Sequence, residues 1–288
     1  MLFKIVTDSS ANLPAQYIEQ HGIEVLSLSY HVKDESFPSF VKGQPFDMKQ
    51  FYDLLRKKIE IRTSLVKPSD AYDVFERLLA AGNDILYIGF SSGLSGTFST
   101  VSNILSELSE KYPERKTASV DTLGASLGQG SLVTYAVRMQ EQGKTLVEVR
   151  DWLLLNRYRQ AHLFTVDDLF FLKRGGRINT AAAILGTLAG IKPCLDMDDE
   201  GRLINIDKIR GRNAVLRWLC DRMEQEAVDP DGQTVFIVHG DCESDALRLR
   251  DLIAGRLNVK EFVIEYLEPV IASHCGPGTL GLFYMRQG

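Results

Sequence analysis

The chain has 288 residues, 44% of them hydrophobic and 25% charged, with a formal net charge of −5 at pH 7. These values are ordinary for a soluble globular protein long enough for two domains. The acidic balance argues against nucleic acid as the main partner, because phosphate backbones require a basic surface.

Neither a membrane span nor a signal peptide is expected, because the chain has no run of about 18 apolar residues and its N-terminus lacks a basic start. We therefore expect a cytoplasmic protein. Its cysteines show no paired spacing and are expected to be reduced; they are Cys194, Cys220, Cys242 and Cys275.

The first half of the chain alternates predicted strands with predicted helices. Strands are expected at 2–7, 23–30, 84–90 and 117–120. Helices are expected after Pro14, over 48–59, over 68–82, from Thr97 and up to Gly143. Such alternation indicates βαβ units and a parallel sheet.

The second half has more strands than helices. An amphipathic segment over 145–159 precedes six strand candidates, at 162–166, 191–196, 203–210, 234–238, 261–267 and 280–285. Residues 198–201 have the composition of a hairpin turn, so the second sheet is predicted to be mixed. The predicted fold is α/β with two domains: residues 1–160 with a parallel sheet, and residues 161–288 with a mixed one.

The segment 84–100 combines a buried strand, a small-residue loop and the start of a helix. Ligands of open α/β sheets bind at the carboxyl ends of strands, and the free N–H groups at a helix start favour an anion. The loop adds the hydroxyls of Ser91, Ser92, Ser95 and Thr97. It therefore predicts a pocket for an acidic or oxygen-rich group. Residues 62–64 are expected to form a second hydroxyl-bearing loop.

The same segment contains the G-x-S-x-G pattern of a serine hydrolase at 89–93, which would make Ser91 a nucleophile. Asp241 and His274 follow in the matching chain order. However, the predicted helix begins only after Gly96, whereas a nucleophile elbow requires an immediate turn into the helix. A hydrolase acting on an acyl ester remains the alternative hypothesis.

Nucleotide and metal sites are not predicted. Residues 143–145 resemble the end of a P-loop but follow a helix instead of a strand, and the histidines and cysteines lack ligand spacing on a helix face. No cofactor is expected. Two other segments stand out. Three cations surround two glycines at 173–177, before an apolar helix predicted over 181–188. Residues 274–279 are predicted to form a glycine-rich turn.

Taken together, the chain resembles the DegV family of bacterial fatty-acid-binding proteins. The resemblance covers essentially the whole chain and rests on segments that occur in the same order. They are Asp8-Ser9-Ser10, Thr63-Ser64, residues 91–97, Gly175-Gly176-Arg177-Ile178, Lys192-Pro193 and residues 274–278.

The resemblance implies a carrier without catalytic activity of its own that encloses a long-chain fatty acid between two domains. Such carriers present the carboxylate to a separate kinase subunit, similar to dihydroxyacetone kinases, which forms an acyl phosphate for phospholipid synthesis. Transient membrane contact is compatible with this role.

By motif match, Thr63 and one serine of the Ser91-Ser92 pair, with Ser92 favoured, would hold the carboxylate, and His274 would lie nearby. Supporting residues would be Ser64, Ser91, Gly93, Ser95, Gly96 and Gly276. The basic loop would contact the kinase through Lys173, Arg174 and Arg177. Hydroxyls suit this task, because a buried carboxylate must be hydrogen-bonded or it takes up a proton.

Overall fold

The computed structural model describes residues 3–178 and 190–288. Its first sheet, sheet A, is parallel with the strand order β2-β1-β6-β7. These strands are β1 (Lys4–Asp8), β2 (Glu24–Leu26), β6 (Ile85–Gly89) and β7 (Thr117–Asp121). Every residue of β6 is buried, which is typical of a central parallel strand covered on both faces.

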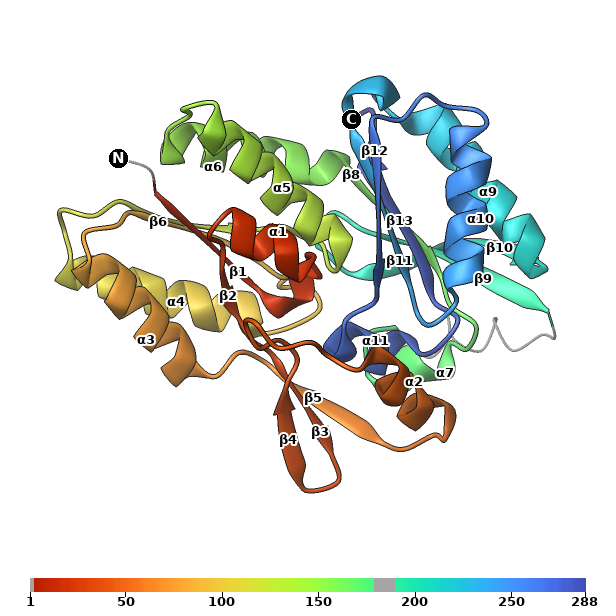
Figure 1. Ribbon diagram of the computed structural model, residues 1–288, viewed down its shortest axis with the longest axis horizontal. Helices are drawn as coiled ribbons and strands as arrows, with labels where there is room; N and C mark the ends of the chain where they lie inside the picture. The colour runs from red at the N-terminus through yellow and green to blue at the C-terminus, as the bar shows by residue number, and fades with distance from the viewer. Residues whose placement is uncertain (1–2, 179–189) are drawn as a thin grey trace.

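Helices cover both faces of sheet A (Figure 1). On one face, Ile85 and Tyr87 pack with α3 (Pro68–Ala80) and α4 (Thr97–Lys111). On the other, Leu86 and Ile88 pack with α5 (Leu127–Glu141) and α6 (Leu146–Asn156). The side chains of β6 alternate between the two cores, as the strand period of two requires. The predicted parallel α/β unit is therefore confirmed.

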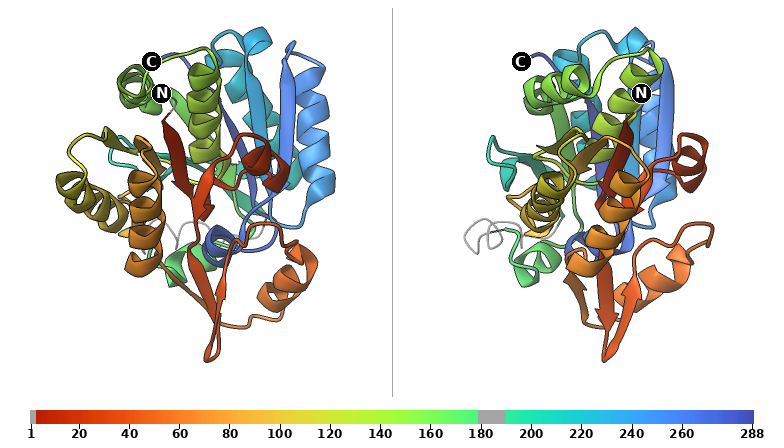
Figure 2. Two further views of the ribbon diagram at one scale, coloured as in Figure 1. Left: turned by 60° about the vertical axis from the view of Figure 1, so that its left-hand side comes forward. Right: turned by 90° about the vertical axis from the view of Figure 1, so that its left-hand side faces the viewer.

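A small antiparallel sheet, sheet B, was not predicted. Its order is β4-β3-β5, and its strands are β3 (Ser29–Val32), β4 (Glu35–Pro38) and β5 (Ile61–Ser64). The hairpin β3–β4 projects from the body of the molecule (Figure 2). Aromatic packing holds it, because the ring of Tyr30 lies 5.4 Å from that of Phe37 and 5.2 Å from that of Phe51 in α2 (Met48–Arg56).

Sheet B corrects two expectations. The single strand expected over 23–30 is divided between β2 in sheet A and β3 in sheet B, because the chain leaves sheet A after Leu26. Thr63 and Ser64 were expected in a loop, but they are the last two residues of β5 and pair with Tyr30 and Ser29. Their backbone is thus fixed by a strand ladder.

The third sheet, sheet C, is mixed as predicted, with the order β10-β9-β8-β13-β11-β12. Its strands are β8 (Gln160–Thr165), β9 (Ile191–Met197), β10 (Leu203–Arg210), β11 (Thr234–His239), β12 (Glu261–Tyr266) and β13 (Leu280–Met285). β11 and β12 are parallel, whereas the other neighbouring strands are antiparallel. Helices α9 (Arg212–Glu226) and α10 (Glu243–Ala254) cover one face.

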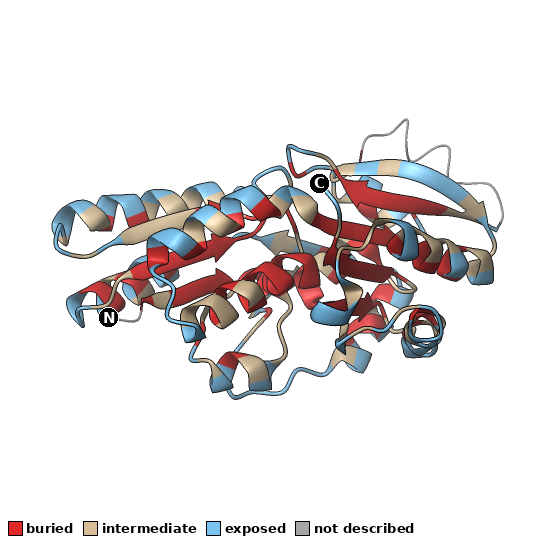
Figure 3. Cartoon of the chain, turned by 90° about the horizontal axis from the view of Figure 1, so that it is seen from above, coloured by how far each residue is buried: buried red, intermediate tan, exposed pale blue. Residues whose placement is uncertain are grey.

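The other face of sheet C is turned toward the N-terminal half. Phe164, Phe236, Val238 and Phe283 lie on it and share a hydrophobic core with Leu127 of α5. Seen from above, buried strands lie between helices whose outer surfaces are exposed (Figure 3). The space between the two large sheets is therefore mostly apolar.

Short helices complete the chain. They are α1 (Ala15–Gln20), α7 (Phe170–Arg174), α11 (Pro269–Cys275) and the 3-10 turns Ser9–Ala11, Arg157–Arg159 and Pro230–Gly232. The turn predicted over 274–279 begins two residues too early, because His274 and Cys275 end α11. The helix predicted over 181–188 lies outside the described residues. None of the helices described is long and apolar enough to cross a membrane.

Candidate functional site

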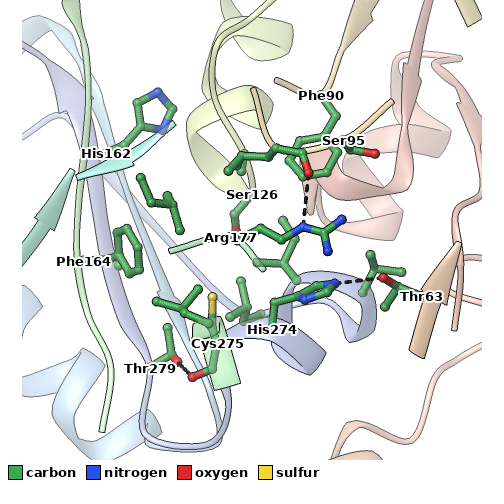
Figure 4. Close-up of a pocket in the computed structure, with 18 of the residues that line it drawn as sticks. Thr63, Phe90, Ser95, Ser126, His162, Phe164, Arg177, His274, Cys275 and Thr279 are labelled. Carbon is green, nitrogen blue, oxygen red and sulfur yellow. Dashed lines mark hydrogen bonds between the residues drawn. The ribbon is translucent and has the colours of Figure 1, made fainter. Parts of the chain in front are cut away.

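A cavity of about 390 Å³ lies between the two large sheets, within the size range of small-molecule sites. Most of its lining is apolar, contributed by both halves of the chain; it includes Phe90, Phe164, Leu172, Val238, Ile271 and Phe283. A smaller group of lining residues is polar: Thr63, Ser64, Ser95, Arg177 and His274. Figure 4 shows Arg177, His274 and Thr63 next to one another, apart from Phe164.

A buried carboxylate fixes the start of the loop between β6 and α4. Asp8, at the end of β1, accepts hydrogen bonds from the backbone N–H of Phe90 at 3.0 Å and from the hydroxyl of Tyr87 at 2.9 Å. Burial raises the pKa of Asp8, and hydrogen bonds from Ser10, Phe90 and Tyr87 oppose that rise. The Asp8-Ser9-Ser10 segment thus positions Phe90 at the cavity wall instead of contacting the cavity itself.

Thr63 and His274 form a hydrogen-bonded pair across the two halves of the chain. The distance between Thr63 Oγ1 and His274 Nε2 is 2.8 Å (Figure 4). His274 reaches this position from the last turn of α11, whose helical spacing also places Val270 and Ile271 at the cavity. Glu268 caps α11 by accepting hydrogen bonds from the N–H groups of Val270 and Ile271.

The imidazole of His274 is neutral at pH 7. Burial, together with the positive charges of Arg177 and Arg174, lowers its pKa to about 4. Gly175 lies against the ring, since a Cβ atom at this position would be 2.1 Å from Nδ1 of His274. Only glycine allows the basic loop to approach the histidine this closely.

Arg177 lines the cavity, although the sequence placed it at a kinase contact. Its Nε donates to the carbonyl of Leu94 at 3.2 Å, and a terminal nitrogen donates to the carbonyl of Gly175. Burial lowers its pKa. Among the described residues, no carboxylate forms an ion pair with it. The guanidinium therefore offers positive charge to whatever occupies the cavity.

The other two cations of the basic loop lie outside the cavity lining. Lys173 and Arg174 are exposed. The guanidinium carbon of Arg174 lies 5.1 Å from the centre of the Phe171 ring and 6.0 Å from that of Phe170, distances typical of cation–π contacts. The predicted kinase-contact trio is thus divided between the surface and the cavity.

The serines between β6 and α4 are likewise divided between the protein surface and the cavity. Ser92 and Gly93 are exposed, and Ser92 is not part of the cavity lining, whereas Ser95 and Gly96 are. Ser95 Oγ accepts from the N–H of Thr97 at 3.2 Å, which fixes it at the start of α4. Proximity to the first helical residue is the sequence signal that could have favoured Ser95 over Ser92.

Two predicted supporting residues, Ser64 and Gly276, lie at different places relative to the cavity. Ser64 lines the cavity and its hydroxyl lies 2.7 Å from Nε2 of His31. Gly276 has a φ of +79° and packs against Phe171 outside the cavity lining.

The hydrolase hypothesis finds no assembled triad. The hydroxyl of Ser91 is buried and donates to the carbonyl of Gly201 at 2.7 Å. Asp241 forms an ion pair with Arg56, and His274 is bonded to Thr63. In a catalytic triad these three side chains would be hydrogen-bonded to one another, but here each one is bonded to a different residue.

Metal ligands do not gather in the described ranges 3–178 and 190–288, where no group of three or more suitable side chains is found. All four cysteines are free thiols. Cys275 lines the cavity. Burial raises its pKa to about 12, so this thiol is protonated and unreactive at neutral pH.

Fold and site together define an α/β protein whose two large sheets enclose a mostly apolar cavity with hydroxyl, imidazole and guanidinium groups in its lining. The family model described as "Uncharacterised protein, DegV family" matches residues 2–287. A DegV domain-containing protein from Clostridium perfringens is 40% identical over 283 residues, which are 98% of this chain and 97% of the relative. The chain belongs to the DegV family.

Solved structures agree with this assignment. A DegV family protein from Thermus thermophilus, described for its fatty acid binding, superposes with a TM-score of 0.87 at 29% identity, covering 100% of both chains. DegV from Bacillus subtilis, described as a fatty acid binding protein, gives a TM-score of 0.82 at 27% identity, again over 100% of both chains.

Proposed function

We propose that this protein binds a long-chain fatty acid in the cavity, with its carboxylate at Arg177, Thr63 and Ser95. The observation that carries the proposal is the guanidinium of Arg177, which lines an otherwise apolar cavity without an acidic partner among the described residues. Arg177 is half-buried, and a cation removed from water in this way is stabilised by a counter-charge. Relatives from Thermus thermophilus and Bacillus subtilis that are described as fatty acid binding support the choice of ligand.

The Thr63–His274 pair gives the headgroup site a defined proton arrangement. When Nε2 of His274 carries the proton and donates to Thr63 Oγ1, the threonine hydroxyl is free to donate to a carboxylate oxygen. His274 then orients Thr63 instead of contacting the ligand directly. Arg177 supplies the charge, and Ser95 a second hydroxyl.

The apolar lining supplies most of the affinity. At about 0.8 kcal/mol per buried methylene, a chain of about sixteen carbons contributes roughly 12 kcal/mol before the costs of binding are subtracted. Hydroxyls and a guanidinium can donate hydrogen bonds to a carboxylate or to the bulkier acyl phosphate, because both groups present anionic oxygens. The site is therefore suited to hold substrate and product of a phosphorylation.

We further propose that the protein has no catalytic activity and presents the carboxylate to a separate kinase subunit, similar to dihydroxyacetone kinases. Lys173 and Arg174 are exposed, and so is Phe170, with 59% of its surface accessible. An exposed aromatic beside two cations is suited to a protein contact. In this proposal residues 1–160 and 161–288 are the two domains, and the carrier works in the cytoplasm for phospholipid synthesis.

Native mass spectrometry of the purified protein tests fatty acid binding. We expect one long-chain fatty acid per chain, and loss of that mass in Ala125→Phe, because Ala125 lines the cavity and a phenyl ring would fill it. Leu155→Phe is the matched control, since 73% of Leu155 is exposed. A wild-type protein that neither carries nor takes up fatty acid would contradict the proposal.

A further inference from the structure

Strand β9 loses its pairing with β8 before it ends, although it stays paired with β10 as far as Met197. Its ladder with β8 pairs Leu195 with Phe164. At the next residue, the N–H of His162 donates to the side-chain Oδ1 of Asp196 at 3.1 Å, in place of a backbone carbonyl. The same oxygen accepts from the N–H of Met197 at 2.8 Å. Beyond Asp196 the chain is thus held to sheet C only as a hairpin with β10.

We call residues 197–203 the hairpin flap. Two of its members, Met197 and Leu203, line the cavity. Its turn is preorganised, because Oδ1 of Asp198 accepts from the N–H of Glu200 at 3.0 Å and that of Arg202 at 2.8 Å. The flap therefore has a turn held by its own hydrogen bonds, and it forms part of the cavity wall.

The tip of the flap docks on the loop between β6 and α4. The buried hydroxyl of Ser91 donates to the carbonyl of Gly201 at 2.7 Å and accepts from the N–H of Gly93 at 3.2 Å. Two glycines permit this approach. A Cβ atom on Gly93 would be 2.5 Å from the carbonyl oxygen of Glu200, and one on Gly201 would be 2.2 Å from the Ser91 hydroxyl.

Ser91 also fixes the headgroup side of the same loop. Its carbonyl accepts from the N–H of Leu94 at 3.1 Å and from that of Ser95 at 3.2 Å. Both residues line the cavity. One serine thus joins the hairpin flap, through its hydroxyl, to the turn that carries Ser95, through its backbone.

We propose that Ser91 is a positioning residue that latches the hairpin flap closed over the cavity, and that the acyl chain enters and leaves when this latch opens. The proposal assigns to Ser91 neither nucleophilic attack nor contact with the carboxylate. It rests on the proposed function, because the ligand whose exchange it controls is the fatty acid.

The rate at which bound fatty acid dissociates tests whether Ser91 holds the hairpin flap closed. We expect displacement of a fluorescent long-chain fatty acid, followed by stopped flow, to be about three- to tenfold faster in Ser91→Ala, the range that loss of one hydrogen bond gives. Ser92→Ala is the matched control, because the neighbouring serine is exposed. Equal dissociation rates in wild type, Ser91→Ala and Ser92→Ala would overturn the proposal.

The latch can also be broken from the flap side. Gly201→Ala places a methyl group against the Ser91 hydroxyl, whereas Gly211→Ala imposes comparable backbone strain, at φ +91°, with no atom within 4 Å. Only the first should accelerate exchange. The double variant Ser91→Ala/Gly201→Ala should be no faster than the faster single variant, because both break one contact. Full additivity would contradict a shared latch.

A second measurement separates failure of the latch from failure of the proposed function. Amide hydrogen exchange over residues 197–203 should be faster in Ser91→Ala than in wild type without any ligand, and unchanged in Ser92→Ala. If the protein binds no fatty acid, the proposed function fails, and this experiment still decides on the latch. Unchanged hydrogen exchange in Ser91→Ala would refute it.

Discussion

Ser95→Ala should weaken fatty acid binding more than any other serine substitution in the loop between β6 and α4. Ser95 lines the cavity, and its hydroxyl can donate to a carboxylate there when Thr97 Oγ1 is the donor of the bond between the two hydroxyls. A hydrogen bond to a charged group contributes about 1.5–3 kcal/mol, so affinity should fall by about 10- to 150-fold. Isothermal titration calorimetry with a saturated fatty acid measures the loss.

The same substitution has a second, separable effect. Ser95 Oγ lies 2.9 Å from Thr97 Oγ1 and accepts from the N–H of Thr97, the first residue of α4. Loss of one hydrogen bond costs about 0.5–1.5 kcal/mol in the free energy of unfolding. Urea denaturation of the empty protein measures this effect independently of the ligand.

Ser92→Ala is the control that can refute the reasoning. Its side chain is exposed and outside the cavity lining, so affinity should stay within twofold of wild type, on the order of 0.4 kcal/mol. If Ser92→Ala lost affinity and Ser95→Ala did not, the carboxylate would bind on the outer side of the loop, and the headgroup site proposed above would be wrong.

Three further outcomes test the headgroup and its surroundings. Arg177→Gln should lower affinity for a fatty acid at least about tenfold but not for the matching fatty alcohol. Arg174→Gln should preserve both affinities and, if the proposed kinase subunit is the partner, weaken its binding in a salt-dependent way. Burial, together with the charges of Arg177 and Arg174, lowers the pKa of His274 to about 4, and a bound carboxylate raises it. Calorimetry in buffers of different ionisation enthalpy should therefore detect proton uptake that grows as pH falls from about 7 toward 5; uptake of the same size in His274→Gln would exclude the histidine. A fluorophosphonate probe should leave Ser91 unlabelled, and stoichiometric labelling would restore the hydrolase hypothesis.

The sequence was sufficient to predict those elements whose hydrophobic pattern lies within a single short segment. The apolar run of β6 and the helical spacing that follows Thr97 are visible in adjacent residues, and both elements are confirmed. Sheet B was missed because its signal is not local. β3 pairs with β5 across about thirty residues, and neither strand shows the period-two pattern of a half-buried strand over enough residues to be recognised.

The site was less predictable than the fold because side-chain direction in a loop is not encoded by spacing. Ser92 and Ser95 carry the same side chain, and only the packing of the loop places Ser95, and not Ser92, at the cavity. From the sequence, Arg177 is predicted to be a surface cation because the residues before it in the chain include two other cations. Its position depends on the carbonyl of Leu94, 83 residues earlier in the chain. Such a contact becomes visible only once the two halves are folded together.

An apolar ligand bound in the cavity between the sheets would become part of the protein's own hydrophobic core. An occupant present at 100 times its dissociation constant would add about 2.7 kcal/mol to the free energy of unfolding, and each tenfold rise in its concentration adds about 1.4 kcal/mol more. For a protein of ordinary marginal stability this is a substantial share. If the protein carries a fatty acid as proposed, it is least resistant to heat and proteolysis without its ligand, and its lifetime then depends on the supply of that ligand.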